Sequence, residues 1–120
     1  MIILKGAEIM DRQTIWTVTN KFAKEAKEVF GDKLNAVILF DSCAREDFEP
    51  DSDIDIMVLP DLPQDEINIA RRRFSSHKNI LDMDYDVLIA PVYQSSKVFE
   101  KYLPVSCFYQ KVQREGVRIA

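Results

Sequence analysis

The sequence predicts an α/β domain in which helices pack on a small mixed β-sheet. Apolar residues recur every three or four positions from Asp11 to Phe30, which is the period of an amphipathic helix. The run from Ala36 to Phe40 is continuously apolar, which is typical of a strand buried on both faces. Helical and strand-like segments then follow one another along the chain, as in α/β domains. The length of 120 residues suits a single domain, in which we expect residues 1–9 to form an N-terminal arm.

The first predicted helix has clear boundaries and one apolar face. Asp11 can cap its start, and Gly31 suits the backbone position after its end. The residues on the apolar face are Ile15, Val18, Phe22, Ala26 and Val29.

The remaining elements are predicted from shorter patterns and from prolines. Pro60 and Pro63 end a second strand, and Pro91 is expected to end a third. A final helix is expected to end at Gly116. In chain order, the segments are a strand over Asp53–Leu59, a helix over Gln64–Lys78, a strand over Met83–Ala90, a helix from Ser95 or Ser96 to Leu103, and a helix from about Val105 to Arg114.

Composition indicates a globular, cytoplasmic protein. The two cysteines, Cys43 and Cys107, are far apart and lack metal-ligand spacing, so we expect free thiols in a reducing cytosol. The net charge of −4 and the pI near 5.0 argue against a nucleic-acid-binding protein. Arg71 to Arg73 form a basic run, but a solvated helix face explains it better than a nucleic-acid site. The lone histidine, His77, is expected on the surface, and no apolar run is long enough to span a membrane.

Two aspartates at the start of the second strand carry the strongest chemical signal. Side chains two apart on a strand point to the same side, so Asp53 and Asp55 should face one way and Ile54 the other. Two neighbouring carboxylates repel one another unless a cation lies between them, and Mg²⁺ binds through one or two carboxylates plus water and phosphate oxygens. An isolated Asp-x-Asp is also common in turns, where solvent satisfies both acids.

A third acid near this pair would support the prediction of a metal site. Asp86 lies on the strand predicted over Met83–Ala90 and could complete the metal shell or accept a proton from a hydroxyl group. Asp84 lies on the same face and is its rival, and Asp82 is a further alternative.

Ser42 and Arg45 follow the first strand and are candidate phosphate ligands. A hydroxyl and backbone N–H groups at a strand exit can hold phosphate oxygens if the next residues begin a helical turn. The alternatives are a capping role for Ser42 and an ion pair of Arg45 with Glu46, Asp47 or Glu49.

These residues together resemble a known family. Ser42, then ten residues, then Asp53-Ile54-Asp55 resembles the GS-x10-D-x-D signature of minimal nucleotidyltransferases (MNT type) of the DNA polymerase β superfamily. The match includes Ala44-Arg45, Asp47 and Pro50-Asp51-Ser52, and the tail FYQKVQREGVRI is similar to the closing helix of these short chains. The resemblance covers about Ala36 to Ile119 and implies a nucleotidyltransferase fold like the polymerase β palm.

The resemblance also implies an activity. A nucleoside triphosphate, most often ATP, would bind with Mg²⁺ and give its nucleoside monophosphate to a hydroxyl acceptor. Asp53 and Asp55 would hold metal, Asp86 would hold the catalytic metal or act as base, and Ser42 would hold triphosphate oxygens. Short members often act as antitoxins that modify a helical HEPN-type toxin. The sequence does not specify the acceptor or the base preference. It does not specify the oligomeric state either, and a homo-oligomer is one alternative.

Three positions depart from the family pattern. Asp41 and Glu46 stand where the family has glycines, and Cys43 stands where a basic residue is common. Each change makes the triphosphate site less open or less positive. An alternative function is therefore a binding module that keeps the fold and inhibits a partner by docking.

Overall fold

The computed structural model describes residues 11–49 and 51–120. The N-terminal arm expected over residues 1–9 lies outside the described residues. The elements in chain order are α2 (Arg12–Phe30), η1 (Gly31–Lys33), β1 (Leu34–Phe40), α3 (Ser42–Arg45), β2 (Ile54–Pro60), α4 (Gln64–Tyr85), β3 (Ile89–Tyr93), α5 (Ser96–Tyr102), α6 (Cys107–Glu115) and β4 (Val117–Arg118).

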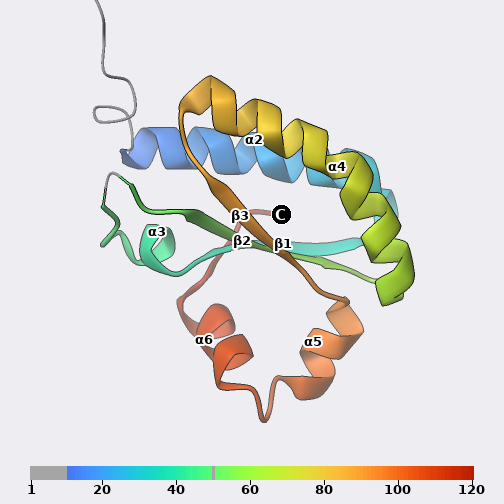
Figure 1. The fold of residues 1–120 in the computed structure, drawn as a ribbon. Coiled ribbons are helices and arrows are strands. Elements are labelled where there is room, and N and C mark those ends of the chain that lie inside the picture. The colour runs from blue at the N-terminus through green and yellow to red at the C-terminus, as the bar shows by residue number, and fades with distance from the viewer. Residues whose placement is uncertain (1–10, 50) are drawn as a thin grey trace, which may run out of the picture.

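The described strands form one mixed sheet with the order β3-β2-β1-β4. β1 is antiparallel to both β2 and β4, whereas β2 and β3 are parallel. The helices α2 and α4 lie over one face of the sheet, and α5 and α6 lie on the other (Figure 1). The α/β class predicted from the sequence is confirmed.

Helix α2 begins and ends where the sequence predicted. The side chain of Asp11 accepts a hydrogen bond of 2.8 Å from the backbone N–H of Thr14, which caps the helix. Gly31 follows the last residue with φ 57°, a conformation that glycine adopts at no steric cost.

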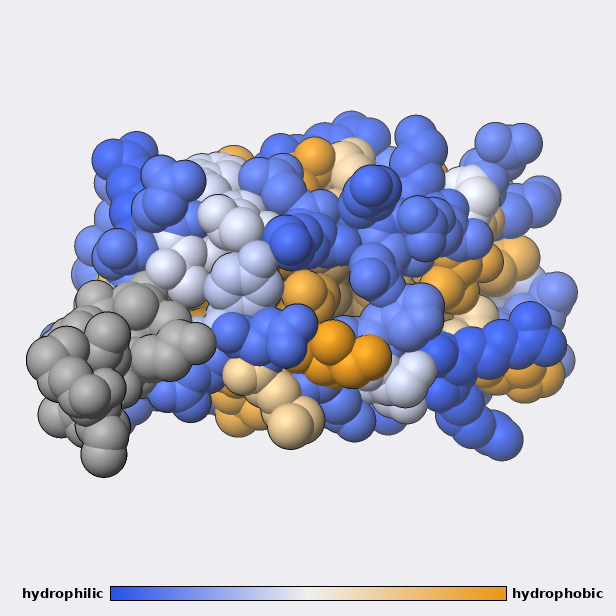
Figure 2. All heavy atoms as spheres, turned by 90° about the horizontal axis from the view of Figure 1, so that it is seen from above, coloured by the Kyte–Doolittle hydropathy of each residue, from blue (hydrophilic) through white to orange (hydrophobic). Residues whose placement is uncertain are grey.

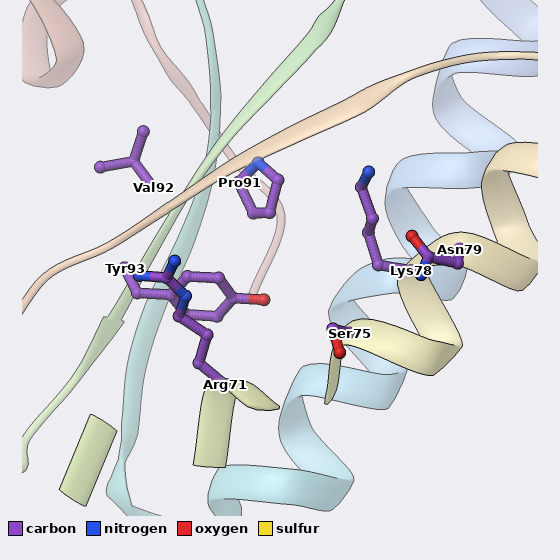
Figure 3. A pocket seen from close by; sticks show the side chains of 7 residues that line it. All are labelled: Arg71, Ser75, Lys78, Asn79, Pro91, Val92 and Tyr93. Carbon is purple, nitrogen blue, oxygen red and sulfur yellow. The ribbon is translucent and has the colours of Figure 1, made fainter. Parts of the chain in front are cut away.

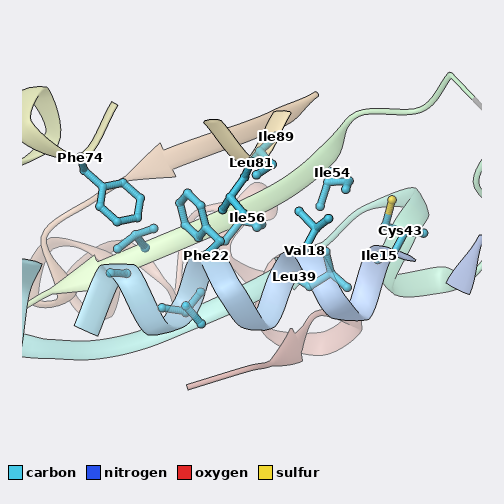
Figure 4. Packing of buried hydrophobic residues seen from close by; sticks show 14 of the residues in the cluster. Ile15, Val18, Phe22, Leu39, Cys43, Ile54, Ile56, Phe74, Leu81 and Ile89 are labelled. Atoms are coloured by element: carbon cyan, nitrogen blue, oxygen red, sulfur yellow. The ribbon is translucent and has the colours of Figure 1, made fainter. Parts of the chain in front are cut away.

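Alternation along the central strands divides the core into two layers. In β2, Ile54, Ile56 and Val58 join the cluster beneath α2 and α4. Met57 and Leu59 join a second cluster with Phe99 of α5 and Val112 of α6. Figure 4 shows the first cluster, which α2, α3, α4 and strands β1 to β3 build together. β1 contributes to both clusters, which confirms that it is buried on both faces.

The third strand is where the sequence prediction was wrong. α4 does not end at Lys78 but continues to Tyr85, and β3 spans Ile89–Tyr93 rather than Met83–Ala90. The physical reason is Leu81, which is 6% exposed and lies seven residues after buried Phe74 on the same helix face. Burying that extra turn against the core outweighs the strand-like alternation of the residues that follow.

Pro91 lies inside β3 and does not end it, which is a second correction. β3 is an edge strand, and its backbone bonds to β2 run through Leu88, whose carbonyl accepts from Ile54, and Gln94, whose N–H donates to Val58. Backbone groups alternate in direction along a strand, so Pro91 faces away from β2 and no ladder bond needs its missing N–H.

The last helix ends at Gly116 because two neighbours come very close there. A Cβ atom at this position would collide with the carbonyl oxygen of Val112 and the side chain of Ile38. Glycine therefore lets the chain turn directly from α6 into β4.

The outer face of α2 and α4 is mostly hydrophilic, with separate small hydrophobic spots (Figure 2). None of the helices within the described ranges is long and apolar enough to cross a bilayer.

The contact between Phe22 and Phe74 should hold α2 and α4 together. Both side chains are fully buried, and their rings meet edge to face with centroids 4.8 Å apart. We expect Phe74→Ala to lower the free energy of unfolding by about 3–5 kcal/mol, measured by urea denaturation. Ile69→Ala, at a 53% exposed position of the same helix, is the control and should change it by less than about 0.5 kcal/mol. Equal losses in the two variants would contradict this packing.

Candidate functional site

The Asp53–Asp55 pair lies at the start of β2, on the sheet face covered by α5 and α6. Asp55 is paired with Phe40 of β1 and with Ala90 of β3. Phe40 belongs to the second core cluster, so Asp55 shares its side of the sheet, opposite to Ile54. Asp55 is half-buried, and Asp53, just before the strand, is exposed.

Electrostatics shows that three carboxylates converge here. Burial, followed by the negative charges of Asp41 and Asp53, raises the pKa of Asp55 to about 6. The buried thiol of Cys43 has its pKa raised to about 11, first by burial and then by Asp55, with Asp41 and Asp53 contributing less. The site is therefore acidic, and among the described residues Arg45 pairs with Asp41 whereas no cation forms an ion pair with Asp53 or Asp55.

The buried side chain of Cys43 anchors the turn that carries Ser42 to the core. Ser42 is the first residue of the short helix α3 and is half-buried. Cys43 points into the core and its Sγ lies 3.5 Å from the carbonyl oxygen of Asp53. This contact ties the start of α3 to the first acid of the pair.

The backbone explains why glycine is suited to two positions of this turn. Asp41 has φ 64° and ψ −146°, and Glu46 has φ 65° and ψ 22°. The first is a region that residues other than glycine rarely enter, and the second is left-handed. Both are the positions at which the resembled family carries glycine, so this chain keeps the turn and adds two acidic side chains.

Arg45 is held by three carboxylates. Its guanidinium contacts Asp41 at 3.0 Å, Asp47 at 3.1 Å and Glu115 at 3.5 Å. The ion pair with Asp47 was one of the alternatives drawn from the sequence, whereas Glu46 pairs with Arg12 instead. Glu115 comes from the end of α6 and was missed, although the tail that contains it is part of the family resemblance.

The structure separates the three candidates for the third acid. Asp84 lies on α4 and lines a pocket with Lys21 of α2, on the face opposite to Asp55. Asp82 is already engaged, because its carboxylate contacts Lys78 at 2.6 Å and accepts from the N–H of Ile89 at 2.9 Å. These two carboxylates therefore serve other contacts.

Asp86 is not on a strand, which corrects the sequence prediction. It follows the last residue of α4 in a left-handed conformation with φ 52°, and its side chain is exposed. The β3 residue paired with Asp55 is Ala90, four positions later. Within residues 11–49 and 51–120, no three His, Cys, Asp or Glu side chains are grouped closely enough to share a metal ion.

The arrangement nevertheless fits a divalent cation held mainly by Asp53 and Asp55. Their charges are uncompensated, and Mg²⁺ needs only one or two carboxylates when water and phosphate oxygens complete its shell. A small pocket of about 80 Å³ adjoins the pair and is lined by Phe40, Asp41, Phe108, Lys111, Val112 and Glu115. Lys111 is an exposed cation that the sequence did not single out, because nothing near it in the chain marks it.

Fold and site together define a class of protein. An Asp-x-Asp at the start of a central strand, beside a strand-to-helix turn with a serine, is the arrangement of nucleotide-transferring α/β domains. A family model described as the nucleotidyltransferase domain matches residues 19–104. The chain belongs to the nucleotidyltransferase family, as the motif around Ser42 and Asp53 indicated, and it is thereby placed among enzymes.

Three proteins of Methanocaldococcus jannaschii, each assigned as a protein adenylyltransferase, are similar to this chain. One is 32% identical over 108 residues, which cover 85% of this chain and 95% of the relative. Another is 30% identical over 97 residues, covering 80% and 88%. A third is 30% identical over 89 residues, covering 69% and 56%.

Two solved structures share the fold. A toxin–antitoxin crystal structure with AMP-PNP gives a TM-score of 0.54 at 23% identity, covering 84% of this chain and 72% of that chain. A MntA–HpeT toxin–antitoxin structure with two aspartate-to-glutamate substitutions gives 0.53 at 21% identity, with the same coverage. At these identities the likeness shows the nucleotidyltransferase fold alone.

The strained backbone at Asp41 leads to a stability prediction. We expect Asp41→Gly to raise the free energy of unfolding by about 1 kcal/mol, because a residue other than glycine in this conformation costs about 1–3 kcal/mol. Asp47→Gly is the matched control, since it also removes a carboxylate from Arg45 but at a residue without positive φ. The exposed ion pairs contribute little in either case. Urea denaturation of both variants measures the difference, and equal stabilities would contradict the backbone argument.

The raised pKa of Asp55 predicts a pH dependence of stability. Folding favours the protonated acid, so this contribution is fully present below about pH 4 and is lost as the pH rises through about 6. We expect Asp55→Asn to remove that loss, so that the variant gains stability relative to the wild type as the pH rises from 4 to 7 without divalent cations. Urea midpoints across this range measure it. Asp51→Asn, at an exposed position of the same loop, should follow the wild type.

Proposed function

We propose that this chain transfers the adenylyl group of ATP, with Mg²⁺, to a hydroxyl group on another molecule and releases pyrophosphate. The observation that carries the proposal is the uncompensated carboxylate pair, in which burial and the neighbouring Asp41 and Asp53 charges raise the pKa of Asp55. Family membership supports the reaction class, and a relative assigned as a protein adenylyltransferase, 32% identical over 95% of its length, supports adenylyl transfer to a protein.

Each residue has a proposed role. Asp53 and Asp55 hold the metal, which when bound neutralises phosphate charge. Ser42 binds phosphate oxygens through its hydroxyl at the start of α3. Asp86, just before β3, supplies the third carboxylate or accepts the proton of the attacking hydroxyl. Such a site accelerates transfer by positioning and by charge neutralisation.

Arg45 takes part indirectly in this proposal. Its contacts with Asp41 and Glu115 orient two carboxylates at the rim and connect α3 to α6. A nucleotide would compete with these carboxylates for the guanidinium. Lys111 is the cation that lines the adjoining pocket.

The proposed acceptor is a toxin of the helical HEPN type, which makes this chain a cytoplasmic antitoxin. Toxin–antitoxin complexes share the fold, one of them with AMP-PNP, and this supports a nucleotide and a protein partner. The predicted reducing environment agrees with two free cysteines, of which Cys107 is exposed.

A docking module without catalysis is the second candidate. The observation that favours it is the acidic character of the turn, where Asp41 and Glu46 occupy glycine-type conformations and Arg45 is neutralised by carboxylates. Extra negative charge opposes the approach of a polyphosphate.

Labelled ATP distinguishes the two candidates. The chain is incubated with α-labelled ATP and Mg²⁺, with and without a HEPN-type partner, and label on protein is measured after gel separation. We expect transfer that needs Mg²⁺ and is abolished in Asp53→Asn and in Asp55→Asn, while Asp51→Asn retains it. Partner binding without transfer, unchanged in the Asp53 and Asp55 variants, would favour the docking module.

The role of Asp86 can be tested separately. We expect Asp86→Asn to reduce transfer by roughly 10- to 100-fold, the loss typical when a carboxylate that supports a metal site is removed. Asp84→Asn is the control, because this acid faces the groove between α2 and α4 and should leave transfer unchanged. A larger loss in Asp84→Asn than in Asp86→Asn would contradict the proposed role of Asp86.

A further inference from the structure

A second hollow lies between α4 and the edge strand β3. Its volume is about 470 Å³, and it is lined by Arg71, Ser75, Lys78, Asn79, Pro91, Val92 and Tyr93. We call it the α4–β3 pocket. In Figure 3, Pro91 and Tyr93 lie on the side of the strand that faces the helix, whereas Val92 points away from it. The volume is within the range of small-molecule sites, roughly 300–1,000 Å³.

The lining of this pocket is rich in hydrogen-bond donors and holds no carboxylate. The guanidinium of Arg71 lies over the ring of Tyr93, 5.8 Å from its centroid, and no carboxylate of the described residues forms an ion pair with it. Lys78 contacts Asp82 at 2.6 Å, which leaves two of its three N–H donors for a ligand. Asn79 adds an amide.

Tyr93 supplies a further donor from the strand. Its ring is fixed by Phe74 and Phe30, with centroids 6.3 and 6.5 Å away. Burial raises the pKa of its hydroxyl, so that it remains protonated and able to donate at any physiological pH. In Figure 3 the hydroxyl points toward the helix side of the pocket.

The strand wall of the pocket offers few backbone donors to an added β-strand. The outward N–H of Ile89 already donates to the side chain of Asp82 at 2.9 Å, and Pro91, the next outward position, has no N–H. An occupant must therefore bind through side chains, and the donors select for an anion.

The pocket is also distinct from the acidic pair. Tyr93 packs against the cluster beneath α2 and α4, whereas Asp55 faces α5 and α6 on the other side of the sheet. A ligand bound here would not contact Asp53 or Asp55.

We infer that the α4–β3 pocket binds a small phosphorylated molecule of mononucleotide size, with Arg71 and Lys78 pairing with the phosphate. A guanidinium and an ammonium at one site, with neutral donors between them, are the groups that recognise phosphate oxygens. The net charge of −4 disfavours a long polyanion on this surface.

An NMR titration of amide resonances tests this inference with the full chain and without divalent cations. The probes are AMP, inorganic phosphate, adenosine and a ten-residue oligonucleotide. We expect AMP to shift the amides around Arg71, Lys78, Asn79 and Tyr93 saturably, inorganic phosphate to shift the same amides more weakly, and adenosine to shift none. Shifts with adenosine equal to those with AMP, shifts confined to the acidic site, or a response to the oligonucleotide alone would overturn the inference.

Two matched pairs of variants complete the test. Arg71→Gln should weaken AMP binding about tenfold or more, since it removes a charged donor, while Arg73→Gln, exposed but outside the pocket, should not. Ser75→Asp should abolish binding by placing a negative charge in the pocket. Ser76→Asp is its control, because both hydroxyls donate to the carbonyl three residues earlier and only Ser75 lines the pocket. Equal effects within either pair would contradict the assignment.

Discussion

Antiparallel pairing of β1 with β2 is the constraint on which the acidic site depends. It places Phe40 opposite Asp55 on the face that α6 covers, so that Asp41, the next residue, comes close to the pair. The charges are then confined between a buried strand on one side and the turn into α3 on the other. Their mutual repulsion and the burial of Asp55 make a cation the natural complement of this edge of the sheet.

Arg45 neutralises part of this negative charge at the edge of the site. Arg45 draws Asp41, Asp47 and Glu115 together and so connects the turn to the last helix. The backbone of this turn is strained, because Asp41 and Glu46 adopt conformations that glycine would adopt freely. The turn therefore keeps glycine-type backbone conformations but carries extra negative charge, and the two candidate functions differ in how they account for that charge.

The length of α4 determines how the remaining acids are distributed. Because the helix continues to Tyr85, Asp82 is used to pair with Lys78 and to hold the N–H of Ile89, and Asp84 turns toward α2. Asp86 follows directly after the helix, before β3. The helix wall of the α4–β3 pocket lies earlier on the same helix, at Arg71, Ser75, Lys78 and Asn79.

Local patterns in the sequence were sufficient for the α/β class, for α2 with its Asp11 cap, for β1 and for β2. These features depend on periodicity, capping and strand alternation, all of which act over a few residues. The extent of α4, the inclusion of Pro91 in β3 and the contact of Arg45 with Glu115 were not predictable in this way. The extent of α4 depends on the burial of Leu81, and the place of Pro91 depends on the edge position of β3. The contact of Arg45 with Glu115 joins residues that are far apart in the chain. Only the folded chain decides such contacts, because burial and pairing are properties of neighbours in space.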